Sequence, residues 1–282
     1  MRLTTKIVLG IILSIFLLSL GLIIGFSSSD RKNYMSMPPY GSLTISQENV
    51  TAVDVKPYKT IWLDKEAEAD DEHITPYPIG SLQLNAAANE EEHRKLHLSE
   101  ELLEYTEITS SNDTLIIRLK KRELSKKNPQ KDKRKHISYH AVDMLGFNFQ
   151  LYTNSVDVIS NWAGIDINVT GIESKKIKIN APANVNIENC KADVIEPIGR
   201  NSHKNLLIKN TRARELNIDF DNIANFNIED CHIDIQNYTG SKSHDIRFSE
   251  NEHRIINWLP KNKDAKLKIE LRGGDTTKIV FP

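Results

Sequence analysis

Three aspartates lie in strand-like segments of this 282-residue chain, at Asp193, Asp219 and Asp234. Enzymes that cleave polysaccharides use two carboxyl groups about 5 to 10 Å apart, one as an acid and the other as a base or nucleophile. Acidic residues on outward strand positions also simply keep a protein surface solvated, and lysines and glutamates alternate with them here. This pattern favours a solvated wall, so we predict that the chain is not an enzyme and has no catalytic residues.

Two pairs of histidines have a spacing that can hold a metal ion on one helix face: His93 with His97, and His136 with His140. Neither pair has the glutamate that follows the first histidine in zinc proteases, and both lie in charged, loop-like stretches. We therefore predict no metal site and no cofactor.

A basic tract runs from Arg118 to Lys135 and contains ten Lys or Arg residues against two acidic residues. Such a charge concentrates polyanions, but it also keeps a plain loop between strands in solution. The tract has no aromatic residue to stack on bases, which argues against a nucleic-acid partner. We predict a basic loop over residues 118–136, in which the candidate anion-binding residues are Lys126, Lys127, Lys131, Lys133, Arg134 and Lys135.

The tryptophans Trp62, Trp162 and Trp258 could stack on sugar rings. They are scattered along the sequence, and large aromatic side chains more often pack in a core or a cap. We therefore expect them to be structural.

The strands that must position all these residues are indicated by a short sequence motif, called the repeated phrase here, that recurs about every twenty residues. Its copies begin at Val185, Leu206 and Phe226, with a fainter copy at Ile246, so the starts are 21, 20 and 20 residues apart. A fixed period of this size is typical of a solenoid, in which each repeat buries its apolar face against its neighbours. The alternative is an antiparallel sandwich, but the chain lacks the Asn-Gly and Asp-Gly dipeptides that mark hairpins. We predict an all-β fold, a parallel β-solenoid (β-helix), preceded by one N-terminal transmembrane helix.

Each copy of the phrase begins with alternating apolar residues, as on a strand with one buried face, and then its parity slips. A strand cannot change face without a bend, and Asn and Asp tolerate the left-handed backbone of such a bend. The pairs predicted to form corners are Glu188–Asn189, Lys209–Asn210 and Glu229–Asp230. The inward residues after the corners are predicted to be Cys190, Ala192 and Val194 in one copy and Cys231, Ile233 and Ile235 in another.

Cys190 and Cys231 occupy the same place in the first and third copies. Stacked strands are about 4.8 Å apart, so residues two repeats apart are separated by roughly 9 to 10 Å. A disulfide needs Cα atoms closer than about 7 Å. We predict two free, buried thiols.

Residues 7–26 carry no charge and are almost entirely aliphatic. Twenty helical residues span about 30 Å, the thickness of the hydrocarbon core. A cleaved signal peptide has a shorter apolar core and an Ala-x-Ala-like site. We therefore predict an uncleaved transmembrane signal anchor, with cleavage as the alternative.

This anchor sets the predicted organisation: residues 1–6 form a short cytoplasmic flank and residues 27–42 a polar tether. Residues 43–154 are the irregular N-terminal part of the β-domain, which includes the basic loop, and residues 155–282 are the regular solenoid rungs. The expected location is the bacterial inner membrane, crossed once, with the folded domain in the periplasm. The alternative is the cell surface or secretion after signal cleavage.

Two segments resemble the head GIN-domain family of Bacteroidota envelope proteins, a family labelled as auto-transporter adhesins. The segments are Leu98-Ser99-Glu100-Glu101-Leu102-Leu103-Glu104-Tyr105 and Asn112-Asp113-Thr114-Leu115-Ile116-Ile117, which look like the family's short helical turn, polar turn and strand. The resemblance covers about residues 43–282 and implies a β-helical fold with no established catalytic residues. The chain departs from the family in its few glycines, its basic insertion and its retained anchor.

Together these features favour a membrane-anchored, exported protein with a non-enzymatic role in adhesion or as a scaffold of the cell envelope. The alternatives are a polysaccharide-active enzyme on a β-helix and an accessory subunit of a membrane complex. The predicted partners are the membrane, through residues 7–26, and envelope glycans or another envelope protein.

Overall fold

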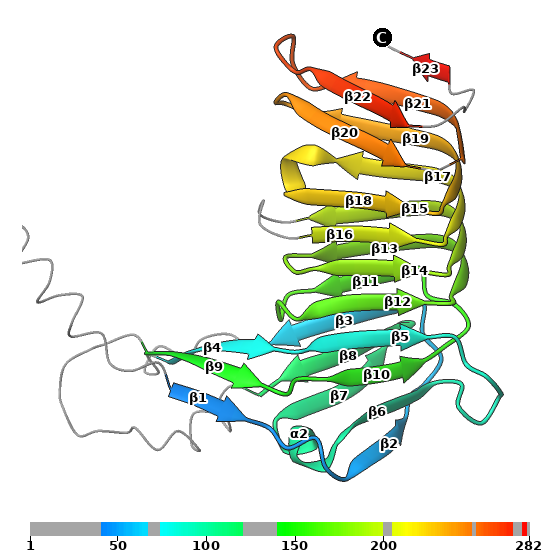
Figure 1. The fold of residues 1–282 in the computed structure, drawn as a ribbon. Helices are drawn as coiled ribbons and strands as arrows, with labels where there is room; N and C mark the ends of the chain where they lie inside the picture. The colour runs from blue at the N-terminus through cyan, green and yellow to red at the C-terminus, as the bar shows by residue number, and fades with distance from the viewer. Residues whose placement is uncertain are drawn as a thin grey trace, which may run out of the picture. The chain divides into compact units, whose positions relative to one another are not determined.

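Alternating aliphatic and polar residues, which turn one face of each strand toward a core, run through most of the chain. The structure is a computed structural model that describes residues 41–66, 74–120, 140–199, 205–249, 252–272 and 278–280. Strands dominate these ranges, with one short α-helix and one short 3-10 helix (Figure 1). The predicted all-β class is confirmed.

The described strands of the β-domain (residues 41–282) form two ten-stranded sheets, called sheet 1 and sheet 2 here, and one three-stranded sheet. In spatial order, sheet 1 consists of β2 (Val50–Asp54), β6 (Lys95–Ser99), β10 (Phe149–Tyr152), β5 (Ser81–Asn85), β12 (Asp166–Thr170), β14 (Val185–Glu188), β16 (Asn205–Lys209), β18 (Asn225–Glu229), β20 (His244–Ser249) and β22 (Leu267–Arg272). Sheet 2 consists of β23 (Lys278–Val280), β21 (Glu252–Pro260), β19 (His232–Gly240), β17 (Arg212–Asp219), β15 (Lys191–Gly199), β13 (Glu173–Ala181), β11 (Val158–Asn161), β3 (Thr60–Lys65), β8 (Thr114–Leu119) and β7 (Thr106–Ser111). The third sheet consists of β1 (Gly41–Thr44), β9 (His140–Leu145) and β4 (Ile74–Ile79).

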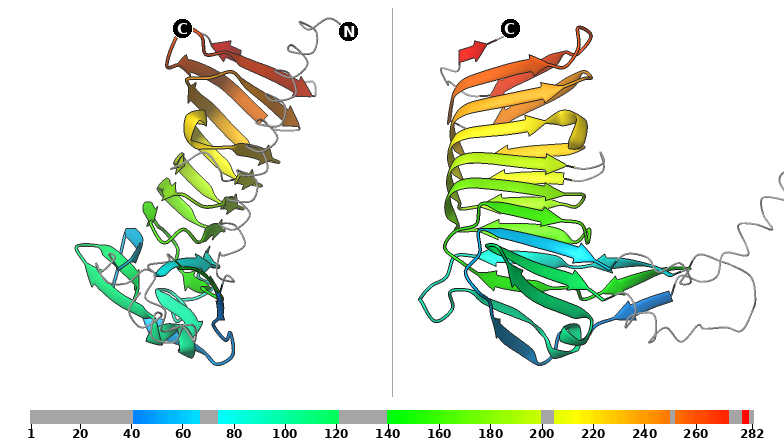
Figure 2. Two further views of the ribbon diagram at one scale, coloured as in Figure 1. Left: turned by 90° about the vertical axis from the view of Figure 1, so that its left-hand side faces the viewer. Right: turned by 180° about the vertical axis from the view of Figure 1, so that it is seen from behind.

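From β11 onward the chain alternates between sheet 2 and sheet 1. Each strand pairs in parallel with the previous strand of its own sheet (Figure 1 and Figure 2). We call one strand of sheet 1 with the following strand of sheet 2 a rung. The register aligns the repeated phrase, since Val185 pairs with Leu206 and Leu206 pairs with Phe226. Equivalent residues of successive rungs therefore stack on one another.

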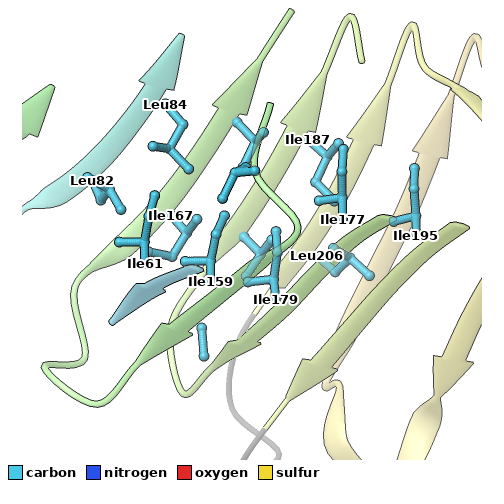
Figure 3. Close-up of a cluster of buried hydrophobic side chains, with 14 of the residues drawn as sticks. Ile61, Leu82, Leu84, Ile159, Ile167, Ile177, Ile179, Ile187, Ile195 and Leu206 are labelled. Carbon is cyan, nitrogen blue, oxygen red and sulfur yellow. The ribbon is translucent and has the colours of Figure 1, made fainter. Parts of the chain in front are cut away.

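The core lies between the two sheets and consists of aliphatic side chains in rows (Figure 3). On sheet 1, Val169, Ile187 and Ile208 are successive partners and are fully buried. On sheet 2, Ile177 pairs with Ile195, and both are also fully buried. Each such side chain contributes roughly 1.5 to 3 kcal/mol by leaving water, so these rows stabilise the stack more than any polar contact.

A tight corner of two residues joins β14 to β15, β16 to β17 and β18 to β19. Its first residue has left-handed backbone, with φ of 55° at Asn189, 47° at Asn210 and 50° at Asp230. Its second residue turns inward and is buried: Cys190, Thr211 or Cys231. The corners lie one residue later than predicted, because Glu188, Lys209 and Glu229 are the last residues of their strands, while Asn189, Asn210 and Asp230 turn as expected. Both cysteines are free and buried, as predicted.

The strands after the corner slip in parity a second time, which the sequence did not reveal. Ala192 pairs with Ala213, and Val194 pairs with Glu215, while both Val194 and Ile235 are only half-buried. The fully buried residues are instead Ile195 and its counterpart in β19, Gln236. The prediction that Val194 and Ile235 point inward was wrong, because one extra residue between the two inward positions reverses the alternation.

The N-terminal end of the stack is closed by antiparallel strands. β6 pairs antiparallel with β2 and β10, and β7 pairs antiparallel with β8. The helix α2 (Glu100–Glu104) follows β6, and the Ser99 hydroxyl caps it by accepting a hydrogen bond from the Leu102 amide at 3.3 Å. Such an end protects the parallel sheets from edge-to-edge pairing.

Strands of the first half of the chain also enter the parallel ladders. β5 lies between β10 and β12, and β3 lies between β11 and β8. β8 runs to Leu119, so Arg118 and the buried Leu119, which we had placed in the basic loop, belong to a strand. The loop boundary was wrong because the basic residues obscured the alternation of that strand.

The predicted anchor over residues 7–26, most of the predicted tether and the remainder of the basic loop up to residue 136 lie outside the described residues. Within the described ranges, no helix is long and apolar enough to cross a membrane.

Candidate functional site

The outer face of sheet 1 carries two rows of polar side chains on neighbouring strands. In the first row, Gln83 of β5 pairs with Asn168 of β12, which pairs with Asn186 of β14. The second row lies two residues further along the same strands and continues to β16. It consists of Asn85, Thr170, Glu188 and Lys209.

These rows line a groove of about 280 Å³ that we call the amide groove. Its outward side chains are Gln83, Asn85, Asn168, Thr170, Asn186, Glu188, Leu207 and Lys209. The volume is slightly below that of a typical small-molecule pocket, which begins at about 300 Å³. A shallow groove of this kind suits part of an extended ligand better than an enclosed small molecule.

Amide groups give the groove its chemistry, because each side-chain amide offers both donors and an acceptor without carrying a charge. Asn186 Nδ2 donates to Asn168 Oδ1 at 2.7 Å, which fixes the orientation of both amides. Within the described part of the chain, the side chains of Gln83 and Asn85 make no hydrogen bond. The amides of Gln83 and Asn85 are therefore available to a ligand. Glu188 and Lys209 place one negative and one positive charge at the rim of the groove.

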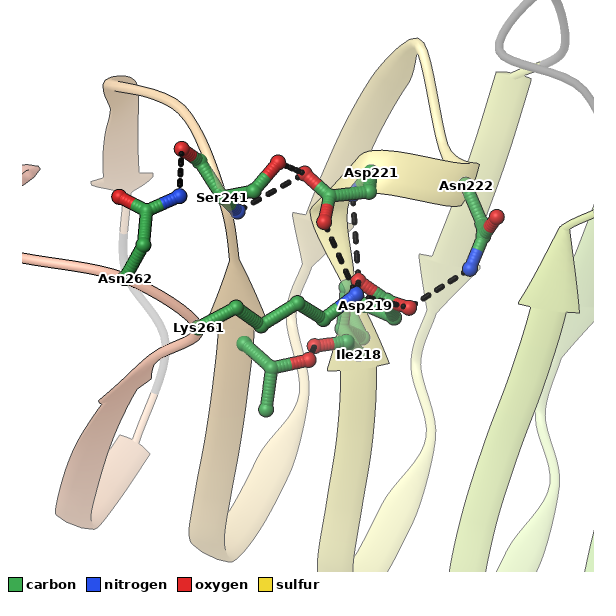
Figure 4. A network of polar contacts seen from close by, with 8 residues as sticks. Ile218, Asp219, Asp221, Asn222, Ser241, Lys261 and Asn262 are labelled. Carbon is green, nitrogen blue, oxygen red and sulfur yellow. Dashed lines mark hydrogen bonds and ion pairs between the residues drawn. The ribbon is translucent and has the colours of Figure 1, made fainter. Parts of the chain in front are cut away.

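A second polar cluster, the open-edge network, lies where the sheet 2 strands return to sheet 1 (Figure 4). Lys261 Nζ donates to both Asp219 oxygens at 2.6 and 2.7 Å and to Asp221 at 2.9 Å. Ser241 donates to Asp221 through its amide at 2.9 Å and its hydroxyl at 2.8 Å. Asn222 and Asn262 extend the network at its two ends. The donors come from successive rungs, so the network joins rungs to one another.

The open-edge network also shifts pKa values. Burial alone would raise the pKa of the Asp221 carboxyl, but the hydrogen bonds from Lys261 and Ser241 outweigh burial and lower it to about 2. The hydrogen bond to Asp219 is the main cause of the raised pKa of Lys261. Asp221 and Lys261 are therefore both charged at neutral pH and form an ion pair, which is a structural arrangement rather than an acid–base pair.

The three aspartates considered as catalytic candidates do not come together. Asp219 belongs to the open-edge network. Asp193 and Asp234 lie at the other end of the sheet 2 strands, two rungs apart, and the register places Arg214 between them. Asp234 also lies 3.6 Å from His232.

The other predicted site residues are either apart or outside the described ranges. The candidate anion-binding residues of the basic loop and His136 lie outside them. His93 and His97 are described, but the described residues include no group of three or more His, Cys, Asp or Glu residues that could hold a metal ion.

The tryptophans separate into two classes. Trp258 is buried, in agreement with a structural role, whereas Trp62 and Trp162 are 41% and 44% exposed. Trp62 lies on β3 and Trp162 directly follows the adjacent strand β11, in which Ser160, two residues earlier, pairs with Trp62. Their distance in sequence concealed this proximity.

The amide groove itself was not predicted. Its signal is the outward position of the repeated phrase, occupied by Asn168 and Asn186 in consecutive strands. Gln83 and Asn85 come from outside the repeat, so their place beside β12 follows only from the topology.

Comparisons with known proteins give structural neighbours but no family assignment. No family model matches the chain, and no curated protein matches it. A protein of Bacteroides fragilis described as a "putative adhesin" is 12% identical with a TM-score of 0.43, over 84% of this chain and 100% of that chain. A second "putative adhesin", from Parabacteroides distasonis, is 11% identical with a TM-score of 0.47, over 86% and 100%. A "putative lipid binding protein" of the same species is 9% identical with a TM-score of 0.30, over 85% and 99%.

Proposed function

We propose that this protein is a non-enzymatic adhesin of the bacterial cell envelope that binds neutral polysaccharide in the amide groove. In this proposal the β-domain is a parallel β-solenoid of the head GIN-domain type. Residues 7–26 anchor it in the inner membrane, and the domain faces the periplasm.

The in-register rungs support the solenoid part of the proposal. The strands β14, β16 and β18 are parallel and their equivalent residues stack, as expected where each repeat buries its apolar face only against its neighbours. A solenoid of this kind presents the same outward positions at a spacing of about 4.8 Å, which makes its face a repetitive binding surface.

The observation that carries the binding role is the row of amides from Gln83 to Asn186. Sugar hydroxyl groups are both donors and acceptors, and side-chain amides match them in both senses. A groove floor without charge favours a neutral polymer, because an ionic ligand would have to give up water without gaining a partner there.

The same groove supports binding without turnover. Glycoside hydrolysis uses two carboxyl groups, and Glu188 is the one carboxylate among the groove residues. The amides cannot replace the second carboxyl group, since they neither give up nor take a proton near neutral pH. A bound saccharide would therefore be held and not cleaved.

A binding screen on the full chain, in a detergent without sugar groups, tests this proposal. The probes are dextran, yeast mannan, cellohexaose and chitohexaose, and product analysis runs in parallel to detect cleavage. We expect at least one probe to bind with no product formed. Absence of binding to all four, or formation of shorter products, would contradict the proposal.

Gln83→Ala is the informative variant, because this exposed side chain makes no hydrogen bond within the described residues and its loss should not affect folding. We expect the affinity to fall by about fivefold to tenfold, the value of one hydrogen bond to a ligand. The matched control is Asn237→Ala, which removes a stacked amide from the outer face of sheet 2 instead. Equal affinities of Gln83→Ala and Asn237→Ala would show that the amide groove is not the binding site.

A further inference from the structure

Two exposed tryptophans mark a second surface, on the outer face of sheet 2 near the N-terminal end of the stack. Trp62 lies in β3, and the Trp162 amide donates to the Leu63 carbonyl at 2.8 Å, which extends the pairing of β11 with β3 beyond Asn161. Trp162 is therefore a diagonal neighbour of Trp62. Given two residues along the strand and one strand across, their backbones are roughly 8 Å apart.

The residues on either side of each tryptophan are buried, which shows that both indoles lie on the outer face of sheet 2. Ile61 and Leu63 flank Trp62 and are buried, and Asn161 and Ala163 flank Trp162 and are buried. Scattered exposed apolar residues are ordinary, but two large indoles side by side form a patch. The third indole, Trp258, is only 4% exposed, so exposure is particular to this pair.

The turn that carries Trp162 is held by a buried side chain. Asn161 Nδ2 donates to the Ile165 carbonyl at 2.5 Å, and Asn161 Oδ1 accepts from the Gly164 amide at 2.9 Å. Gly164 has a φ of 87°, a conformation that side chains other than glycine rarely adopt. These contacts fix the backbone beneath Trp162 before any ligand binds, which lowers the entropy cost of binding.

Polar groups surround the indoles in register. Asp64 lies two residues after Trp62, and Arg118 of the adjacent strand approaches it with an Nε–Oδ2 distance of 3.4 Å. On the other side, Ser160 pairs with both Trp62 and Asn180. The side chains of these four polar residues lie around the apolar patch and can form hydrogen bonds with the hydroxyl groups of a ligand.

We propose that Trp62 and Trp162 form a stacking platform for a β-1,4-linked pyranose chain, with Asp64, Arg118 and Asn180 available to its hydroxyl groups. An indole packs its flat face against the apolar C–H face of a pyranose ring, while hydroxyls at the ring edge reach polar neighbours. A β-1,4-linked chain is flat and extended, so consecutive rings can meet two indoles on one sheet. This proposal shares the ligand class of the proposed function but rests on different residues on the opposite sheet.

The test measures binding of cellohexaose and chitohexaose to the full chain, by calorimetry and by quenching of tryptophan fluorescence. We expect Trp62→Ala and Trp162→Ala each to weaken binding by about tenfold, as for an aromatic anchor of an interface. The matched control is Leu259→Ala, which removes a 49% exposed apolar side chain from β21 of the same sheet and should leave the affinity unchanged. N-bromosuccinimide should oxidise two of the three indoles, and the hexamers should protect both.

Several outcomes would overturn the platform. The first is no binding of either hexamer, and the second is an unchanged affinity in the double variant Trp62→Ala/Trp162→Ala. The third is that the parent chain binds phosphatidylglycerol vesicles but not the hexamers, and that the double variant loses the vesicle binding. The last outcome would identify a lipid surface as the partner. Gln83→Ala separates this proposal from the amide groove: hexamer binding that depends on Gln83 but not on the tryptophans supports the groove alone, and the reverse supports the platform alone.

Discussion

The two edges at which the chain passes between the sheets are built in different ways. At the tight corner, two residues suffice: Asn210 takes left-handed backbone, and Thr211 turns inward. The backbone amide of the left-handed residue bonds to the next rung, from Asn189 to the Lys209 carbonyl at 3.1 Å and from Asn210 to the Glu229 carbonyl at 3.0 Å. At the open edge, the connections are longer and differ between rungs, and side chains such as Lys261 hold them together.

This difference explains why the repeated phrase is visible at all. A two-residue corner restricts the residue types that fit it, so Asn or Asp followed by Cys or Thr recurs in the three corners after β14, β16 and β18. The open edge has many solutions, because its contacts are made by long side chains rather than by backbone geometry. We therefore expect substitutions at the tight corner to cost more stability than substitutions at the open edge.

The largest effect is expected in the strand that leads into the corner. Ile208 is fully buried, so Ile208→Asp would place an unpaired charge in the core and should prevent folding. The neighbouring Lys209 faces the groove, and Lys209→Asp should fold normally. Far-UV circular dichroism and thermal unfolding distinguish the two, and equal tolerance would contradict the assigned faces.

Thr211 makes the next most sensitive contact. Its hydroxyl donates to the Lys209 carbonyl at 2.8 Å and accepts from the Cys190 amide of the preceding rung at 3.2 Å. Thr211→Val keeps the shape but leaves the Cys190 amide without this acceptor. The free energy of unfolding should fall by about 1 to 3 kcal/mol in denaturant titrations. Thr211→Ser retains the hydroxyl and should recover most of the loss.

The left-handed residue of the corner should have a smaller effect. Asn210→Val forces a β-branched residue to a φ of 47°, which should cost about 1 to 2 kcal/mol of unfolding free energy. Asn210→Gly relieves the strain and should be close to neutral in the same titration. If both variants are equally stable, the corner does not depend on this conformation.

The smallest effect is expected at the open edge. The side chains of Lys261, Asp219 and Asp221 are 42%, 31% and 23% exposed, so Lys261→Met should cost no more than about 1 kcal/mol at neutral pH. The lowered pKa of Asp221 stabilises the fold above the ordinary carboxyl pKa of about 4, and this contribution is lost as the pH falls toward 2. Lys261→Met should therefore show a weaker loss of stability between pH 4 and 2 than the parent chain. An unchanged acid profile would argue against the network.

The sequence predicted the all-β class, the corners and the free cysteines, because each depends on local residue types that repeat. The second parity slip, which makes Gln236 a core residue, was not, because one extra residue in a strand leaves no composition signal. The amide groove and the tryptophan pair depend on β3 and β5, which join the stack from outside the repeat.

A thiol placed in the amide groove tests most directly whether the outer face of sheet 1 binds polysaccharide, as we propose. Leu207→Cys introduces that thiol among the groove residues, and Asn237→Cys introduces a control thiol on sheet 2. Cys190 and Cys231 give little background, because burial raises the pKa of both thiols. Alkylation by iodoacetamide is timed with and without each of the four saccharide probes. We predict that a bound probe slows alkylation of the thiol from Leu207→Cys and leaves the rate at Asn237→Cys unchanged. The same effect of each probe on both rates, or no effect on either, would contradict the account.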